Sequence, residues 1–185
     1  MTITELVNQC HANAKDKGFW DNPRELGTMI ALIHSEVTEA LDAGSCAEFC
    51  EELADICIRI GDLCGGLGID LEAVLKEIGQ DIEAEHNLSV NTKEIRDIEK
   101  TFSSLPPDPN TNSNTEKFAC DIHKSLSYAL EADRKNDKEL FAVNIGWVFM
   151  SVFIWAASRG YAIKQNILTK MEKNKTRPRM HGKAY

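Results

Sequence analysis

The sequence predicts an all-α protein, a helical bundle, and three observations carry that prediction. Apolar residues recur at intervals of three and four along most of the chain, which is the spacing of one face of a helix. Serine, threonine, asparagine or aspartate precedes these runs and glycine follows them, as at helix ends. With 185 residues, 43% of them hydrophobic and 27% charged, the chain is large enough to bury a core.

The first two helices are expected at the start of the chain. Thr2 and Glu5 form a capping box for the first helix, and Gly18 ends it. Asn22 is expected to cap the second helix, with Pro23 in its first position, where the missing N–H is of no consequence. The apolar stripe of the second helix consists of Leu26, Met29, Ile30, Ile33, Val37, Ala40 and Leu41.

The third and fourth helices are expected after a short turn. Ser45 and Glu48 match another capping box, and Gly68 is expected to end the third helix. Asp70 is expected to cap a fourth helix that runs towards Glu85. The apolar residues of the third helix alternate in steps of four and three, which indicates bundle packing. They are Phe49, Leu53, Ile56, Ile60, Leu63 and Leu67.

The second half of the chain follows a segment of linker composition. Residues 101–115 are rich in Ser, Pro and Asn, and the charged segment 91–100 precedes them. Asn136 and Glu139 match a capping box for a later helix. Residues 141–157 carry no charge, but they are short for a bilayer crossing and follow a cap signal. We therefore expect a buried helix there, and no membrane partner.

The second half also repeats the pattern of the first. Residues 122–132 echo residues 33–43, with a histidine in the second position of both segments. The sequence therefore predicts two tandem repeats, 1–100 and 116–185, joined by the linker 101–115 and packed as a pseudo-dimer. A later stretch of the match pairs Leu53, Ile56, Ile60 and Gly68 with Ile145, Val148, Val152 and Gly160.

Two pairs of acids stand on consecutive helices of the first repeat. Glu36 and Glu39 are three residues apart, as are Glu52 and Asp55, so each pair lies on one side of its helix. In a dry interior these charges repel unless a cation neutralises them, and oxygen ligands suit a hard ion such as Mg²⁺. The sequence therefore predicts a magnesium site between the two helices. The second repeat is degenerate, with Ser125, Tyr128, Asn144 and Trp147 at the corresponding positions.

The net charge indicates the class of partner, and the cysteines indicate the cellular compartment. The net charge of −8 argues against nonspecific binding to nucleic acid or to an anionic membrane, because both need a basic face. A small molecule or a protein is the expected partner. The six cysteines include no CxxC pair and no secretory segment precedes them, so we expect reduced thiols in the cytoplasm.

Several motifs together resemble one family. They are KGFW at 17–20, IHSEVTEAL at 33–41, EELADI at 51–56, GIDL at 68–71 and KMEKNKTRP at 170–178. The combination resembles the MazG-like all-α nucleoside triphosphate pyrophosphohydrolases, the superfamily of the dimeric dUTPases and dCTP pyrophosphatases, over most of the chain. The resemblance implies Mg²⁺-dependent hydrolysis of a (d)NTP to (d)NMP and pyrophosphate, in house-cleaning of nucleotide pools. It also implies paired subunits, and we expect a homodimer.

The resemblance assigns the charged residues to two groups. The first group, which looks like the metal ligands and the catalytic acids, consists of Glu36, Glu39, Glu52 and Asp55. The second group matches the family's tail after the last helix, where a cation and an amide meet phosphates or sugar. Its members are Lys170, Asn174 and Arg177.

Three further residues have roles implied by the resemblance. His11 and Trp20 fall where related dCTP-cleaving enzymes hold the base, and a Trp face is a suitable stacking surface. Arg59 stands where some relatives have an aromatic residue. We expect it either to bind phosphate or to pair with Asp55, one turn earlier.

One departure from the family pattern predicts a composite site. The first repeat has Ile78 and Ile82 where the Lys and Asn of the tail are expected, so the tail survives only in the second repeat. Because family members build their sites between paired subunits, we expect one site per chain. The first repeat then supplies the acids and the second supplies the phosphate-binding tail.

The sequence bears on two alternatives to an enzyme of this class. A ferritin-like di-iron bundle needs Glu-x-x-His on two helices, and neither Glu39 nor Asp55 belongs to such a pair. A non-catalytic nucleotide-sensing or regulatory helical module remains open, because the second repeat has already lost its acids. The preferred base and sugar also remain open.

Overall fold

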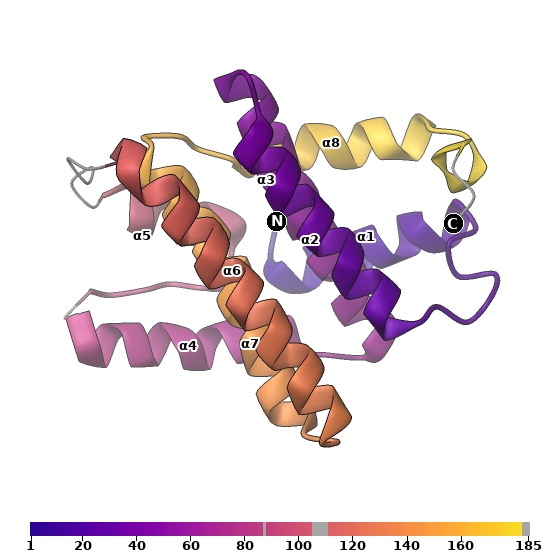
Figure 1. The fold of residues 1–185 in the computed structure, drawn as a ribbon, viewed down its shortest axis with the longest axis horizontal. Coiled ribbons are helices and arrows are strands. Elements are labelled where there is room, and N and C mark those ends of the chain that lie inside the picture. The colour runs from indigo at the N-terminus through magenta and orange to yellow at the C-terminus, as the bar shows by residue number, and fades with distance from the viewer. Residues whose placement is uncertain (87, 105–110, 183–185) are drawn as a thin grey trace.

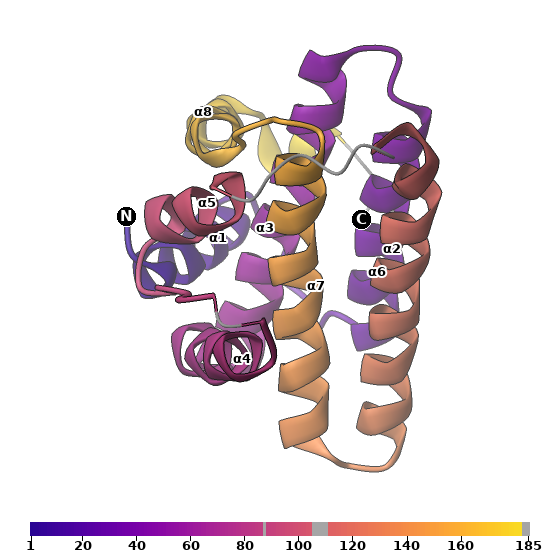
Figure 2. The same cartoon turned by 90° about the vertical axis from the view of Figure 1, so that its left-hand side faces the viewer.

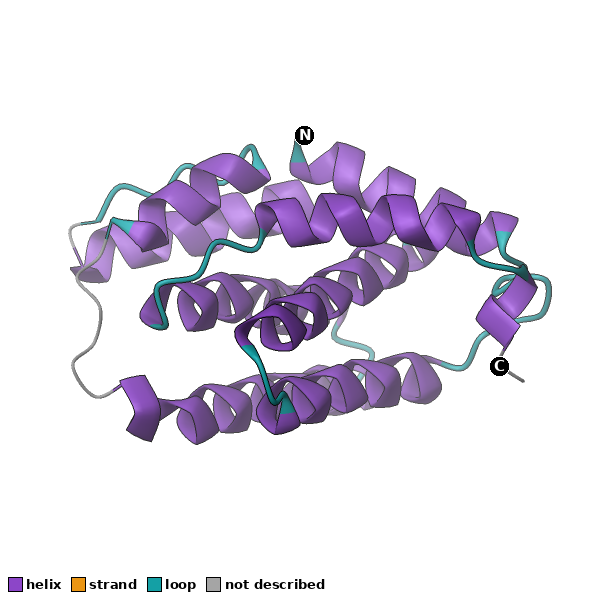
Figure 3. Ribbon diagram, turned by 90° about the horizontal axis from the view of Figure 1, so that it is seen from above, coloured by secondary structure: helices purple, strands orange, loops and turns teal. Residues whose placement is uncertain are grey.

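The computed structural model describes residues 1–86, 88–104 and 111–182, with no side-chain detail for 111–114 and 181. Over this part of the chain there are eight α-helices, one 3₁₀ turn at Arg179–Gly182 and no strand (Figure 3). The predicted all-α bundle is therefore confirmed. The helices are α1 (Ile3–Asp16), α2 (Leu26–Asp42), α3 (Cys46–Leu67), α4 (Leu71–His86), α5 (Ile95–Ser103), α6 (Thr111–Arg134), α7 (Lys138–Ser158) and α8 (Lys164–Thr176).

The helices form three layers with α3 and α7 in the middle. Figure 2 shows α2 and α6 side by side on one face, and α1, α4, α5 and α8 on the other. Figure 1 shows the α6–α7 hairpin running obliquely across the molecule, with α8 lying near the end of α1. Since α3 and α7 each pack against both outer layers, the two are the most deeply buried helices of the bundle.

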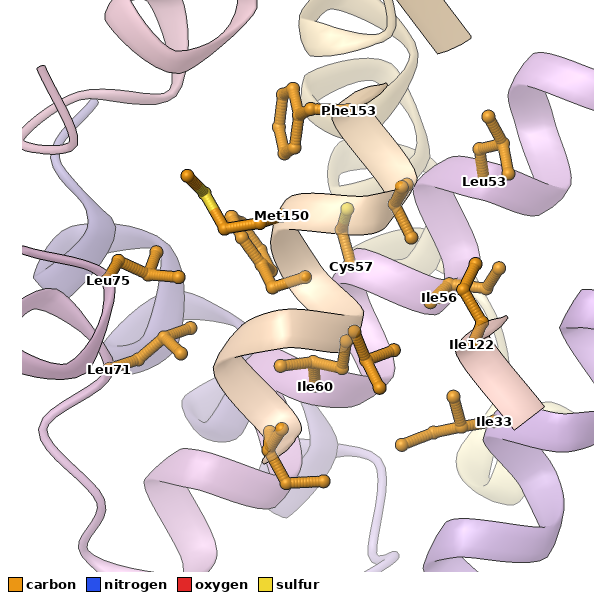
Figure 4. Close-up of a cluster of buried hydrophobic side chains, with 14 of the residues drawn as sticks. Ile33, Leu53, Ile56, Cys57, Ile60, Leu71, Leu75, Ile122, Met150 and Phe153 are labelled. Carbon is orange, nitrogen blue, oxygen red and sulfur yellow. The ribbon is translucent and has the colours of Figure 1, made fainter. Parts of the chain in front are cut away.

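The core is continuous between the two halves of the chain. Leu53, Ile56 and Ile60 of α3 are fully buried, and they lie in one cluster with Ile122 of α6 and Phe153 of α7 (Figure 4). Burying each such side chain contributes about 1.5–3 kcal/mol relative to leaving it in water. The bundle is thus held by packing that neither half completes alone.

Local capping signals place several helix ends as predicted. The reciprocal capping box of Thr2 and Glu5 begins α1, and the Ser45 hydroxyl accepts a hydrogen bond from the Glu48 backbone N–H at the start of α3. Asp70 accepts from the Ala73 N–H at the start of α4. Gly68, with φ of 69°, ends α3 in the left-handed conformation that favours glycine.

Two predicted caps are wrong. Helix α2 begins at Leu26 with no side-chain cap, so Asn22 and Pro23 belong to the preceding loop. Arg24 of this loop pairs with the buried Asp62 of α3, and this ion pair holds the loop against the bundle. The helix therefore begins only after Arg24. At the start of α7, Asp137 rather than Asn136 accepts the capping hydrogen bond, while Asn136 has a positive φ of 56°.

The predicted linker and the charged segment before it are partly helical. The segment 91–100 leads into α5, whose buried residues are Ile95, Ile98 and Phe102. The predicted linker 101–115 includes the end of α5 and the start of α6, and residues 105–110 lie outside the described part of the chain. Helix α5 packs against α7, so this segment belongs to the bundle.

The most apolar helix, α7, is mostly covered by the rest of the protein. Its length and composition alone are sufficient to cross a membrane, but more than half of its most apolar window is buried inside the fold. Phe149, Phe153 and Trp155 are among its buried side chains. The expectation of a buried helix over 141–157 agrees with this placement.

Helix pairings in the first half of the chain have counterparts in the second. α1 packs on α3 as α5 packs on α7, and α8 covers α3 as α4 covers α7. α2 lies against α6, and there His34 stacks on His123 with ring centroids 4.8 Å apart. The two histidines hold the same position in the repeated segments, as expected for residues on a pseudo-twofold axis. The tandem repeat itself stays a prediction.

The histidine pair predicts a loss of stability in acid. The Nδ1 atoms of His34 and His123 lie 2.5 Å apart, and burial lowers the pKa of both imidazoles, with that of His34 lowered further by His123. The unfolded chain therefore binds more protons than the folded protein as pH falls through 6.5, so stability falls. Glu52 titrates in the same range with the opposite effect on stability, so the histidine contribution is measured against the double variant His34→Asn/His123→Asn by urea unfolding. The free energy of unfolding of the wild type relative to the double variant is expected to be lower at about pH 5 than at about pH 8, and an equal difference at the two pH values would contradict the prediction.

Candidate functional site

Three of the four predicted acids form one cluster between α2 and α3. Carboxylate oxygens of Glu36, Glu39 and Glu52 lie within 4.8 Å of one another. The i,i+3 spacing places Glu36 and Glu39 on the same side of α2, and α2 packs against α3 through their shared apolar face. Glu36 is 5% exposed, Glu52 is half-buried and Glu39 is exposed. The cluster thus includes one buried carboxylate, one half-buried and one exposed.

The electrostatics of this cluster favour a bound cation. Burial raises the pKa of Glu52 to about 7, helped by a hydrogen bond with Glu36 and by the charges of Asp55 and Glu36. A carboxyl group held this far above its ordinary pKa is short of positive charge in its surroundings. Three convergent carboxylates suit a hard divalent ion that keeps some of its water. The residues present therefore fit a magnesium ion chemically.

Asp55, the fourth predicted acid, is paired with Lys170 of α8. Nζ of Lys170 lies 2.7 Å from Oδ2 of Asp55 and 2.5 Å from Oε1 of Glu51. Burial lowers the pKa of Lys170, but the two carboxylates outweigh it and raise the pKa above its ordinary value. Hydrogen bonds from Lys170 and Lys173 lower the pKa of Glu51 to about 2. Ion pairs from Lys170 and Lys173 thus hold α8 against α3.

Arg59 pairs with Glu36, not with Asp55. Nε of Arg59 donates to Oε1 of Glu36 at 2.6 Å, and Nη2 contacts the same oxygen. Of the two roles expected for Arg59, pairing with Asp55 one turn earlier on its own helix is therefore wrong. Arg59 lies one turn after Asp55 on α3, and its side chain extends to α2. There it meets Glu36, whose side chain is more buried than that of Asp55.

A single cavity joins the two groups of residues. Its volume is about 250 Å³, and its wall includes all four acids together with Arg59. The same cavity is also lined by Lys170, Asn174 and Arg177. The structure therefore brings together the acids of the first half of the chain and the predicted phosphate-binding residues of the second.

The position of the second group differs from the prediction in one respect. Lys170 and Asn174 lie within α8, one turn apart on one face, and only Arg177 follows the helix. Asn174 is 5% exposed, and its Oδ1 is buried without a hydrogen-bond partner among the described residues. A buried amide oxygen without a partner costs free energy, which a ligand donor in the cavity would recover.

A buried acid that sequence reasoning missed organises the wall near α1. Asp62 of α3 is 8% exposed. Its Oδ1 accepts from Trp20 Nε1 at 2.7 Å and lies 3.1 Å from His11 Nδ1, while Oδ2 accepts from Arg24 Nη1 at 2.9 Å. The only signal in the sequence was a lone acid in the apolar stretch after Arg59. Asp62 and Arg24 line the cavity, whereas the predicted base-contacting pair His11 and Trp20 is engaged with Asp62 behind that wall.

The Asp62 network predicts a large effect on stability. Asp62→Ala leaves the Arg24 guanidinium, whose side chain is only 14% exposed, without its carboxylate. We expect a loss of about 3 kcal/mol in the free energy of unfolding, measured by urea denaturation. Asp21→Ala is the control, because Asp21 pairs with Arg179 at the exposed surface of the same loop and is expected to cost less than about 1 kcal/mol. Equal effects of the two substitutions would contradict the prediction.

Comparison with known proteins adds no relative. No family model, no curated protein and no solved structure matches the chain.

Proposed function

We propose that the protein is a Mg²⁺-dependent nucleoside triphosphate pyrophosphohydrolase, which cleaves a (d)NTP to the (d)NMP and pyrophosphate. One observation carries this proposal. The acids of α2 and α3 and the lysine and asparagine of α8 line the same cavity. A nucleoside triphosphate presents both a metal-binding polyphosphate and oxygens that accept from ammonium and amide groups. The two groups of residues that line the cavity match those two needs.

The roles of the chain's own residues follow from their positions. Glu36, Glu39 and Glu52 would hold the ion, which when bound neutralises phosphate charge and lowers the pKa of a bound water. Lys170 would turn its ammonium from Asp55 to a phosphate oxygen. Asn174, whose buried amide oxygen has no hydrogen-bond partner among the residues that the structure describes, would meet a donor of the nucleotide.

Two further features support the same proposal. The motifs around the acids and in the last helix resemble those of the MazG-like pyrophosphohydrolases, and the all-α fold agrees with that resemblance. The contact of α8 with α3 supports a composite site, with acids from the first of two tandem repeats and phosphate-binding residues from the second. We further propose a cytoplasmic homodimer that removes unwanted nucleotides.

The experiment that tests this function is a pyrophosphate-release assay. The eight common NTPs and dNTPs are each incubated with the protein, with and without Mg²⁺. We expect pyrophosphate rather than orthophosphate from at least one nucleotide, only when Mg²⁺ is present. Glu52→Gln is expected to lose the activity, and Glu48→Gln, an exposed residue one turn earlier on α3, is expected to keep it.

One outcome would favour the alternative of a nucleotide sensor. If a nucleotide binds in the presence of Mg²⁺ but none is hydrolysed, the proposed enzyme activity is wrong. The acids would then hold a ligand without cleaving it.

A further inference from the structure

A basic residue stands inside the acid cluster. Arg59 of α3 lies on the cavity wall beside Glu36, and both nitrogens that reach this acid contact one oxygen, Oε1. The Arg59 side chain is 27% exposed, whereas that of Glu36 is 6% exposed. The pair is therefore not the two-oxygen fork that gives arginine its strongest structural ion pairs. The hydrogen bond from Arg59 goes to Oε1 of Glu36 and none goes to Oε2, and the guanidinium borders the cavity.

The charge balance of the cavity leaves room for one divalent ion. The lining of the cavity carries five acids, Glu36, Glu39, Glu52, Asp55 and Asp62, and four cations, Arg24, Arg59, Lys170 and Arg177. Five negative charges and four positive charges leave a net charge of minus one. One divalent cation brings the site to a net charge of plus one, whereas two would bring it to plus three, which is costly without further anions.

We propose that Arg59 takes the place of a second divalent ion at Glu36. The site then binds one divalent ion, at Glu39 and Glu52 with the remaining oxygen of Glu36, and the Arg59 guanidinium supplies the second positive charge to the polyphosphate. This inference rests on the proposed metal site, but it does not depend on hydrolysis. Some members of the family that the chain resembles have an aromatic residue at this position, which could not supply this charge.

The first test measures metal binding without nucleotide. Mn²⁺ is titrated into the protein and the free ion is counted by electron paramagnetic resonance. The wild type is expected to bind one ion per chain in the cluster. Arg59→Met, which keeps the length and removes the charge, is expected to bind Mn²⁺ about tenfold more tightly, because Glu36 is released and like charge is removed.

Two variants serve as controls for this titration. Arg134→Met removes one positive charge from the exposed end of α6 and is expected to leave Mn²⁺ affinity unchanged. Arg59→Lys keeps the charge and is expected to bind Mn²⁺ like the wild type. If Arg59→Met does not fold, the stoichiometry of the wild type decides, because two tightly bound ions per chain would overturn the proposal.

The second test measures binding of inorganic tripolyphosphate at saturating Mg²⁺, by calorimetry. Arg59→Met is expected to bind tripolyphosphate about tenfold more weakly than the wild type. The expected signature is therefore a gain in metal affinity together with a loss in polyphosphate affinity. If Arg59 merely orients Glu36, its removal weakens metal binding as well, and that result would overturn the proposal. If the wild type bound no polyphosphate, the proposed function and the phosphate role of Arg59 would both fail, while the Mn²⁺ titration would still decide whether Arg59 replaces an ion.

Discussion

Glu52→Gln is expected to reduce nucleotide turnover by at least about 100-fold, and at the same time to make the metal-free protein more stable. The first effect follows because the substitution removes one of the three convergent carboxylates. The second follows because burial, and then the charges of Asp55 and Glu36, disfavour the ionised form of Glu52 in the absence of a metal. Turnover is measured by pyrophosphate release and stability by thermal unfolding in a chelator.

The pH dependence of stability shows whether Glu52→Gln acts by removing an unfavourable charge or by disrupting the fold. The pKa of Glu52 is raised from 4.5 to about 7 in the folded protein. Between these two values the folded state binds more protons than the unfolded state, so the contribution of Glu52 to stability declines as pH rises. The melting temperature of the metal-free wild type should carry this decline, and Glu52→Gln should lack it. A variant that is less stable than the wild type at pH above 7 would contradict the predicted repulsion.

Lys170→Met is expected to lower both the stability of the protein and its affinity for nucleotide. Lys170 is 7% exposed and neutralises Asp55 and Glu51. Its removal leaves the carboxylate of Asp55 buried without its ammonium partner, which we expect to cost about 3 kcal/mol in the free energy of unfolding. The nucleotide KM should also rise by at least about tenfold, because a charge-assisted contact to phosphate is lost. Both quantities are measured on the same preparation.

Lys173→Met is the matched control for this prediction. Lys173 lies on the same helix and contacts the same Glu51 oxygen at 3.1 Å, but its side chain is 55% exposed. We expect its removal to change stability by less than about 1 kcal/mol and to leave KM near the wild-type value. If Lys170 and Arg177 variants kept normal turnover and KM while Glu52 and Asp55 variants lost activity, the composite site would be wrong.

The sequence predicts those parts of the fold that depend on neighbouring residues. The capping box of Thr2 and Glu5 and the left-handed Gly68 are satisfied within one turn of helix, so their signals can be read locally. Helix α5 is different. Its N-cap Glu94 makes no side-chain cap bond, so no capping residue marks its start. Its buried residues Ile95, Ile98 and Phe102 are spaced three and four apart, as on one face of a helix, but the charged residues between them obscure this local signal. Packing of these residues against α7 holds the helix in the bundle.

The same distinction holds for the candidate site. The i,i+3 spacing of the acids identifies their shared side of each helix, so their convergence could be predicted. The pairing of cations with acids could not be predicted, because Lys170 reaches Asp55 only through the packing of α8 on α3. Asp62 illustrates the limit most clearly. The partners of Asp62 come from α1 and from the loop after α1. The spacing of residues along α3 cannot predict these contacts.

We propose that one cavity, built from both halves of the chain, binds a divalent ion and a nucleoside triphosphate together. A crystal structure with Mn²⁺ and an α,β-methylene nucleoside triphosphate tests it most directly. We predict an anomalous Mn²⁺ peak among Glu36, Glu39 and Glu52, with the phosphates against Lys170 and Asn174. A metal or nucleotide bound elsewhere, with Lys170 still paired to Asp55, would contradict the claim.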